Sequence, residues 1–123
     1  MLVVTIILAS CFSLLGDPST TFIKSSTNFD NTKKAVLLLS SGNATVDLSF
    51  QVSIYNNDYE LSGKELGNTF TVDRNHGETS LDSSSINFHW LGNDTLQIDY
   101  DKKLRTFIQE TKVNKVTILY QPR

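Results

Sequence analysis

The chain has 123 residues with 13 acidic and 11 basic side chains and a formal net charge of −2, and its length suits a single domain. Its longest basic runs are the pairs 33–34 and 102–103, a dispersal that argues against the clustered Lys and Arg that bind nucleic acid. The single cysteine rules out an internal disulfide and a metal site built from several thiolates.

An uncharged apolar run opens the sequence. Residues 2–9 are apolar except for Thr5, and the first charged side chain is Asp17. The run is too short for a membrane-spanning helix, which needs about 20 apolar residues, and it fits the hydrophobic region of a secretory signal, about 7–15 residues. Signal peptides normally begin with Lys or Arg, which this run lacks.

The end of the apolar run carries the cysteine. Residues 8–11, Leu-Ala-Ser-Cys, resemble the lipobox of bacterial lipoproteins. This resemblance implies cleavage before Cys11, transfer of a diacylglycerol to its thiol and acylation of the new amine, and paired chains of this kind anchor a protein stably. We expect residues 1–10 to be the signal peptide and residues 11–21 to be the lipidated cysteine with a tether. The alternatives are an ordinary cleaved signal, an uncleaved anchor or a strand of the fold.

Strict alternation of apolar and polar residues over 45–54 is the clearest pattern in the rest of the sequence. This period of two predicts a strand with one face on a core and a polar face that could meet a partner. The apolar positions are Val46, Leu48, Phe50, Val52 and Ile54, and the polar positions are Thr45, Asp47, Ser49, Gln51 and Ser53.

Shorter alternating or apolar runs predict further strands, and clusters of Asn, Asp, Gly and Ser between them predict turns. These runs cover residues 35–39, 70–72, 86–90, 96–100, 104–108 and 116–120, and no window shows a clear helical period. We therefore predict a single all-β domain over residues 22–123, an antiparallel β-sandwich or barrel-like domain of six to eight strands.

Two segments carry more specific expectations. Residues 35–39 are apolar throughout, which indicates a central strand covered on both faces or a strand whose outer face meets a partner. Residues 90–96 are typical of a hairpin in which Gly92 or Asn93 is free to take a positive φ.

The longest polar stretch, residues 73–85, is predicted to be a mobile loop or the functional loop. It contains His76, Glu78 and Asp82, the candidates for contact with a partner. His76 also fits a turn residue with positive φ, and His89 fits an exposed position on its strand. Neither histidine lies in a recognised nucleophile frame or metal-ligand spacing, and we predict no catalytic residue, no metal site and no cofactor.

Several segments in a fixed order resemble a family of small bacterial proteins of unknown function, many with lipoprotein signals. The segments are Asp30–Leu37, Gly42–Asp47 leading into Gln51–Ile54, Asn75–Glu78, Trp90–Ile98 and Val116–Tyr120. Members of that family often carry Cys-Gly before Ala-Thr, where this chain has Gly42 and Asn43. The resemblance implies a lipoprotein of the cell envelope and supplies no activity and no site residues.

Together these patterns predict an extracytoplasmic protein that is anchored to a membrane of the bacterial cell envelope through Cys11. We expect it to bind a protein partner there without catalysing a reaction, and we expect no contact with nucleic acid. One alternative is an enzyme that acts on an envelope polymer through the 73–85 loop. Another is a structural subunit of an envelope complex, with residues 35–39 and Phe107 as an exposed apolar patch.

Overall fold

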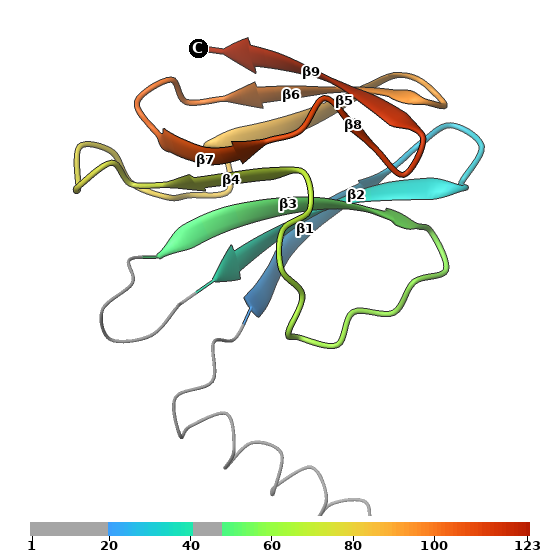
Figure 1. The fold of residues 1–123 in the computed structure, drawn as a ribbon, viewed down its shortest axis with the longest axis horizontal. Coiled ribbons are helices and arrows are strands. Elements are labelled where there is room, and N and C mark those ends of the chain that lie inside the picture. The colour runs from blue at the N-terminus through green and yellow to red at the C-terminus, as the bar shows by residue number, and fades with distance from the viewer. Residues whose placement is uncertain (1–19, 41–47) are drawn as a thin grey trace, which may run out of the picture.

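The computed structural model describes residues 20–40 and 48–123, which form nine β-strands in two sheets (Figure 1). Sheet A has the order β1-β2-β3-β4-β7 and comprises β1 (Thr20–Thr27), β2 (Lys33–Ser40), β3 (Ser49–Asn56), β4 (Phe70–Asp73) and β7 (Arg105–Gln109). Sheet B has the order β5-β6-β9-β8 and comprises β5 (Ile86–Gly92), β6 (Thr95–Tyr100), β8 (Lys112–Val113) and β9 (Val116–Pro122).

The predicted all-β sandwich is confirmed, with two differences of detail. The described residues form nine strands instead of six to eight, because β1 and the two-residue β8 were not predicted. A bulge between Phe22 and Lys24 breaks the alternation of β1, which begins at Thr20 inside the predicted tether. In addition, β6 and β9 pair in parallel, where antiparallel pairing was expected.

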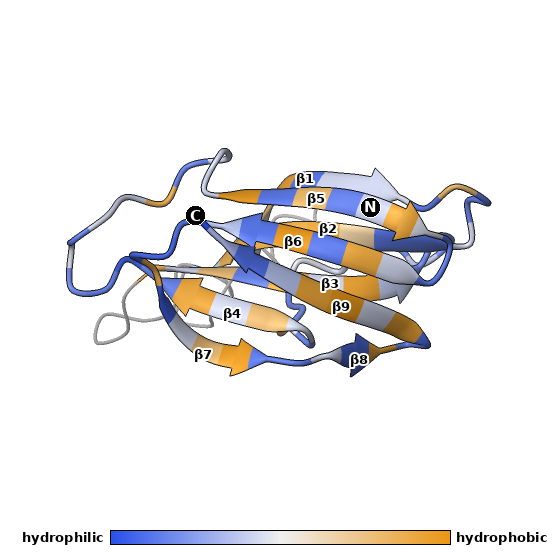
Figure 2. Cartoon of the chain, turned by 90° about the horizontal axis from the view of Figure 1, so that it is seen from above, coloured by the Kyte–Doolittle hydropathy of each residue, from blue (hydrophilic) through white to orange (hydrophobic). Residues whose placement is uncertain are grey.

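The core lies between the two sheets. Figure 2 shows hydrophobic and hydrophilic residues alternating along β6, as expected for a strand with one buried face. The rings of Tyr100 and Tyr120 lie 5.0 and 5.1 Å from the ring of Phe70, so an aromatic cluster joins the sheets. The buried side chains around it include Phe50, Val52, Ile54 and Val72 from sheet A and Ile86, Leu96, Ile98, Val116 and Ile118 from sheet B.

The apolar segment 35–39 belongs to β2, which lies between β1 and β3. Ala35 and Leu37 pack in the core, while Val36 and Leu38 lie on the opposite face and are also buried, at 0 and 1% exposure. The prediction of a strand covered on both faces is confirmed. Residues 35–38 therefore do not form the exposed apolar patch that was expected of a structural subunit.

On the polar face of β3, Gln51 and Ser53 are covered, so these two predicted positions are not available to a partner. Gln51 is 9% exposed and Ser53 is fully buried, because the segment 57–69 crosses them. The Gly67 N–H donates to Oε1 of Gln51 at 2.6 Å, and the Asn68 N–H donates to Oγ of Ser53 at 3.1 Å. Positions 45–47 of the predicted strand lie outside the described residues.

Gly67 is required for this close crossing. A Cβ atom at position 67 would lie 2.7 Å from Cβ of Gln51, a distance that real Cβ atoms do not reach. The absence of a side chain therefore lets the segment 57–69 lie directly on β3.

The carboxylate of Glu65 fixes the same segment. Its Oε2 accepts from the Ser62 N–H at 2.6 Å, the Ser62 hydroxyl at 2.7 Å and the Tyr59 hydroxyl at 2.9 Å, and its Oε1 accepts from the Gly63 N–H at 3.0 Å. Glu65 is 7% exposed, and these four donors satisfy it without a cationic partner from residues 20–40 or 48–123.

The predicted hairpin at 90–96 is confirmed as the β5–β6 connection, and its turn does not use the positive φ that was open to Gly92 or Asn93. Neither Gly92 nor Asn93 is among the residues with positive φ in the described part of the chain. A register shift between Trp90 and Gly92 accompanies the turn, so a bulge takes the place of a left-handed residue.

The two ends of β1 define the two ends of the sandwich. Thr20 pairs with Ser40 at one end, termed the Thr20 end, and Thr27 pairs with Lys34 at the other, beside the β1–β2 turn. The second is termed the turn end (Figure 1). At about 3.3 Å per residue, the eight residues of β1 separate the two ends by about 26 Å.

Candidate functional site

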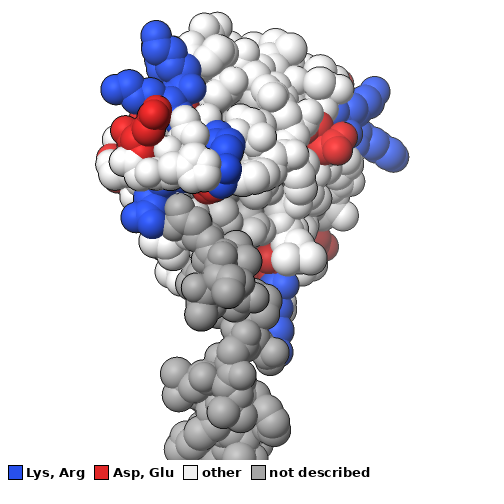
Figure 3. Space-filling model, turned by 60° about the vertical axis from the view of Figure 1, so that its left-hand side comes forward, with Lys and Arg blue, Asp and Glu red and all other residues white. Residues whose placement is uncertain are grey.

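The predicted contact loop, residues 73–85, lies at the Thr20 end. It leaves β4 at Asp73, which pairs with Ser49 at the start of β3. Figure 3 shows this end of the molecule, where basic and acidic side chains are interspersed. The predicted positive φ of His76 is confirmed at 58°, within a left-handed turn that begins at Asn75 and ends at Gly77.

His76 is held by an arginine. Its Nε2 lies 2.9 Å from Nη1 of Arg105, and the same guanidinium binds the Asp73 carboxylate through contacts of 2.6 and 3.2 Å. Because a guanidinium only donates, Nε2 of His76 is the acceptor in this pair. A general base would need a free nitrogen near a substrate, so this geometry adds no support to the enzymatic alternative.

Glu78 and Asp82 have different surroundings. Glu78 is exposed, whereas Asp82 accepts hydrogen bonds from the hydroxyl and the N–H of Ser84, which lower the pKa of its carboxyl. These bonds shape the loop itself. Among the described residues, no hydrogen bond or ion pair joins His76, Glu78 and Asp82 to one another.

A histidine–carboxylate pair lies on the outer face of sheet B, where sequence reasoning placed only an exposed histidine. Nε2 of His89 is 3.1 Å from Oδ2 of Asp99, to which Arg123 also donates at 2.6 and 3.1 Å. Asp99 is 3% exposed. Burial alone would raise the pKa of its carboxyl, but hydrogen bonds from Gln97 and Arg123 outweigh burial and lower that pKa.

Around His76 and His89, the described residues form neither a nucleophile–base pair nor a set of metal ligands. Within residues 20–40 and 48–123, neither histidine bonds to a serine, threonine or cysteine, so no nucleophile–base pair forms there. The same residues contain no group of three or more His, Cys, Asp or Glu side chains that could hold a metal ion.

The remaining predicted positions are Cys11 and Phe107. Cys11 lies outside the described residues, so its lipidation stays a prediction. No helix of a length and hydropathy able to cross a membrane occurs in the part of the chain that the structure describes. Phe107 is 57% exposed on β7, an edge strand, and its ring lies 4.8 Å from the Arg105 guanidinium.

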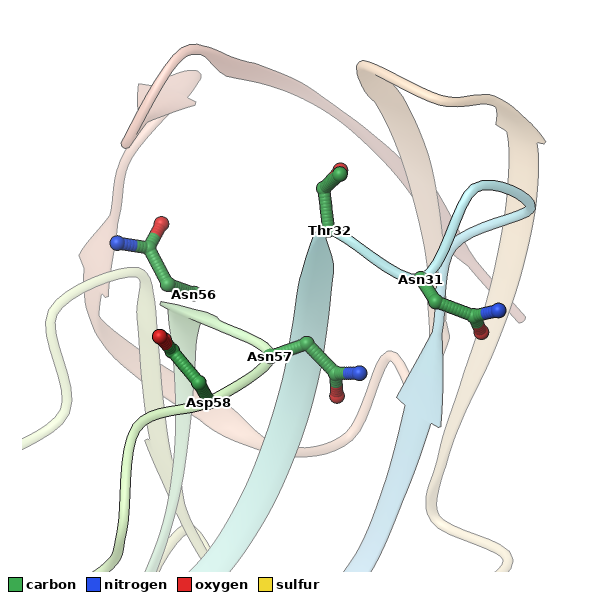
Figure 4. A pocket seen from close by; sticks show the side chains of 5 residues that line it. All are labelled: Asn31, Thr32, Asn56, Asn57 and Asp58. Atoms are coloured by element: carbon green, nitrogen blue, oxygen red, sulfur yellow. The ribbon is translucent and has the colours of Figure 1, made fainter.

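A polar hollow of about 410 Å³ lies at the turn end (Figure 4). We term it the asparagine hollow, and its lining residues are Asn31, Thr32, Asn56, Asn57 and Asp58. They come from the β1–β2 turn and from the turn that follows β3. The antiparallel register of β2 and β3 brings the two turns together, and the Asn57 N–H donates to the Thr32 carbonyl at 3.0 Å.

Three of these side chains have no partner among the residues that the structure describes. The amides of Asn31 and Asn57 and the carboxylate of Asp58 make no hydrogen bond or ion pair with any described residue, and all three residues are exposed. Together they offer amide donors and acceptors and one carboxylate to a ligand. Sequence reasoning assigned both segments to turns and did not bring them together.

The asparagine hollow has a fixed frame. Asn28 is 2% exposed, and its Oδ1 accepts from the N–H groups of Thr32 at 2.9 Å and Lys33 at 3.0 Å. Its Nδ2 donates to the Asn93 carbonyl at 2.8 Å, so it ties the β1–β2 turn to the β5–β6 turn. This buried side chain therefore holds one wall of the hollow against sheet B.

The other wall is fixed through Asn56. Its Oδ1 accepts from Nζ of Lys33 at 2.7 Å and from Nδ2 of Asn114 at 3.2 Å. Asn114 lies in the β8–β9 turn, so this contact also crosses between the two sheets. The free side chains of the hollow thus project from turns that are braced from behind, an arrangement that favours binding without large rearrangement.

Comparisons of the chain with protein-family models, curated proteins and solved structures gave no match. The resemblance to small bacterial proteins of unknown function therefore stays a prediction.

Proposed function

We propose that this protein is a non-catalytic binding module of the bacterial cell envelope, anchored to a membrane through lipid on Cys11, with the asparagine hollow as its recognition surface. The lipobox resemblance of residues 8–11 supports the anchor. The main support is that the hollow lies at the end of the sandwich opposite Thr20, because the predicted anchor precedes Thr20 in the chain.

The chain enters the domain at Thr20, and the asparagine hollow lies at the opposite end of the sandwich. A protein anchored through residues that precede Thr20 would therefore present the hollow away from the membrane, about 26 Å beyond Thr20. The 73–85 loop would face the membrane side.

The lining favours binding over catalysis. It contains three amides, a hydroxyl and a single carboxylate, with no histidine, lysine, cysteine or arginine among them. General acid–base catalysis uses a titratable pair placed about a substrate, and nucleophilic catalysis uses an activated nucleophile. The lining residues supply neither, while they supply several directional hydrogen-bonding groups.

The anchor is tested by expressing the intact chain in bacteria with an alkyne-tagged fatty acid. We expect the wild-type chain to be labelled and to sediment with membranes, and Cys11→Ser to lose both properties, because the thiol is the acceptor of the lipid. Mass spectrometry of the mature protein should show cleavage before Cys11. A mature chain that begins with Met1 and carries an unmodified thiol would refute the anchor.

The recognition surface is tested in the same cells with a photo-crosslinking amino acid at position 57, in the hollow, or at position 78, in the 73–85 loop. We expect specific adducts from position 57 and few from position 78. Adducts that form only from position 78 would assign recognition to the loop instead of the hollow.

A further inference from the structure

We propose that the asparagine hollow binds a neutral oligosaccharide. This inference rests on the proposed function in one respect, since it takes the hollow to be the recognition surface. The hydroxyl and acetamido groups of sugars both donate and accept hydrogen bonds. The free side chains of Asn31, Asn57 and Asp58 match that chemistry, because each amide both donates and accepts and the carboxylate accepts strongly.

The charge of the hollow argues against an anionic ligand. No lysine or arginine lines it, and the nearby Nζ of Lys33 is already engaged by Asn56 and Asn114 at 2.7 and 3.2 Å. A phosphate or carboxylate ligand would meet the unpaired carboxylate of Asp58 with no cation in the lining to offset it.

A bare cation fits less well than a sugar. Calcium takes about six to eight oxygen ligands with several carboxylates among them, and the lining offers a single carboxylate. The volume of about 410 Å³ far exceeds the space of an ion and lies within the range of small-molecule sites, about 300–1,000 Å³.

Exposed aromatic rings belong to both turns that form the hollow. Tyr59 closes the turn after β3, where its N–H donates to the Asn56 carbonyl at 3.0 Å, and its ring stacks on Tyr55 with centroids 4.2 Å apart. Phe29, in the β1–β2 turn, is 69% exposed. Flat apolar rings of this kind pack against the C–H faces of pyranose rings.

The ring of Tyr59 is held in place, which suits a stacking platform. Its hydroxyl donates to Glu65 at 2.9 Å, and 39% of the residue is exposed. A ring fixed at its tip and backed by Tyr55 loses little conformational entropy when a ligand packs on it.

The test titrates chitotetraose and, separately, cellotetraose into the intact lipidated chain in nanodiscs, followed by calorimetry. We expect saturable binding of at least one of these neutral tetrasaccharides. Asn57→Ala and Asp58→Ala should each weaken that binding about tenfold, because each removes a direct hydrogen-bonding group. Asn31 is left unchanged because its φ of 60° makes substitution strained.

Lys102→Ala is the control, an exposed residue that follows Tyr100 at the opposite end of the sandwich, and it should bind like the wild type. Unfolding midpoints of all variants should agree, which shows that lost binding is not lost folding. Absence of binding by both sugars, or binding that neither hollow substitution weakens, would overturn the inference. Binding of calcium chloride alone, abolished by Asp58→Ala, would also overturn it and would identify a cation site.

The two proposals fail in different ways. Failure of both sugars together with specific crosslinking from position 57 would leave the binding module standing and remove only the ligand class. Sugar binding by a chain whose Cys11 carries no lipid would support the ligand class and remove the anchor.

Discussion

At Glu65, hydrogen bonds from neighbouring residues stabilise the ionised carboxylate, whereas burial disfavours it. Burial alone would raise the pKa of its carboxyl, but hydrogen bonds from Ser62, Tyr59 and Gly63 outweigh burial and lower the pKa from 4.5 to about 2. Since the folded-state pKa lies below the unfolded value, the ionised carboxylate stabilises the fold. This contribution is complete above pH 4.5 and is lost as the pH falls toward about 2.

We predict that Glu65→Gln lowers the free energy of unfolding at neutral pH by about 1–3 kcal/mol, because charge-assisted hydrogen bonds to the crossing segment are lost. The variant should also lose part of the acid sensitivity of the wild type between pH 4.5 and about 2. Urea unfolding of the intact chain at neutral pH and near pH 3 measures both effects.

Glu60→Gln provides the control, because Glu60 lies in the same segment and is exposed. Its free energy of unfolding should change by less than about 0.5 kcal/mol. Equal losses in the two variants would show that the Glu65 bonds do not hold the segment.

Neighbouring strands of sheet A differ sharply in their burial. Phe70 of β4 is fully buried against Tyr100 and Tyr120, whereas Phe107 of the adjoining edge strand β7 is 57% exposed and contacts the Arg105 guanidinium. The two phenylalanines therefore report on the core and on the edge of one sheet.

We predict that Phe70→Ala costs about 3–5 kcal/mol of unfolding free energy, since it removes a ring at the centre of the aromatic cluster. Phe107→Ala should cost about 1 kcal/mol or less, the scale of an exposed cation–π contact. Denaturant unfolding of both variants is the measurement. A large loss for Phe107→Ala would mean that β7 is buried by a partner in solution.

Local patterns predicted the strands well where alternation is unbroken, as in β3, β5 and β6. They missed β1 because its bulge between Phe22 and Lys24 interrupts the period. They also assigned Gln51 and Ser53 to an open face, because the segment that covers them follows β3 in the chain and shows no periodicity of its own. The local patterns could not predict the pairing of β6 with β9, because β7 and β8 lie between these two strands in the chain.

The asparagine hollow could have been partly predicted. Residues 31–32 and 56–58 belong to the polar clusters between strands that predict turns, and they flank strands that a short antiparallel connection would pair. What the sequence did not show was the register, which places Lys33 opposite Asn56 and so decides which turns meet. The hydrogen bonds of Asn28 and Asn114 that fix the hollow join turns far apart in the sequence, and local patterns do not predict such contacts.

At the scale of the whole molecule, the two ends should lie at different distances from a membrane. We predict that, in the lipidated chain on vesicles, a fluorophore at position 78 transfers energy to labelled headgroups more efficiently than one at position 57. Glu78 follows β4 at the Thr20 end, whereas Asn57 lies at the turn end. Asn57→Cys and Glu78→Cys introduce the labelling thiols, because Cys11 is predicted to be blocked by lipid.

A soluble chain mixed with the same vesicles is the reference for random collisions. Equal transfer from the two positions of the lipidated chain would show that the domain has no preferred orientation. Greater transfer from position 57 would place the hollow against the lipid and contradict its presentation to a partner.

The strand order of sheet B determines when the sheet can be completed during export. β9 occupies the place between β6 and β8, and its residues Val116 and Ile118 complete the interior. If the chain is exported as proposed, amino end first, β6 gains its second neighbour only after residues 116–122 emerge. On the outer side of the membrane, sheet B would therefore stay incomplete, and one side of β6 unpaired, until residues 116–122 have crossed.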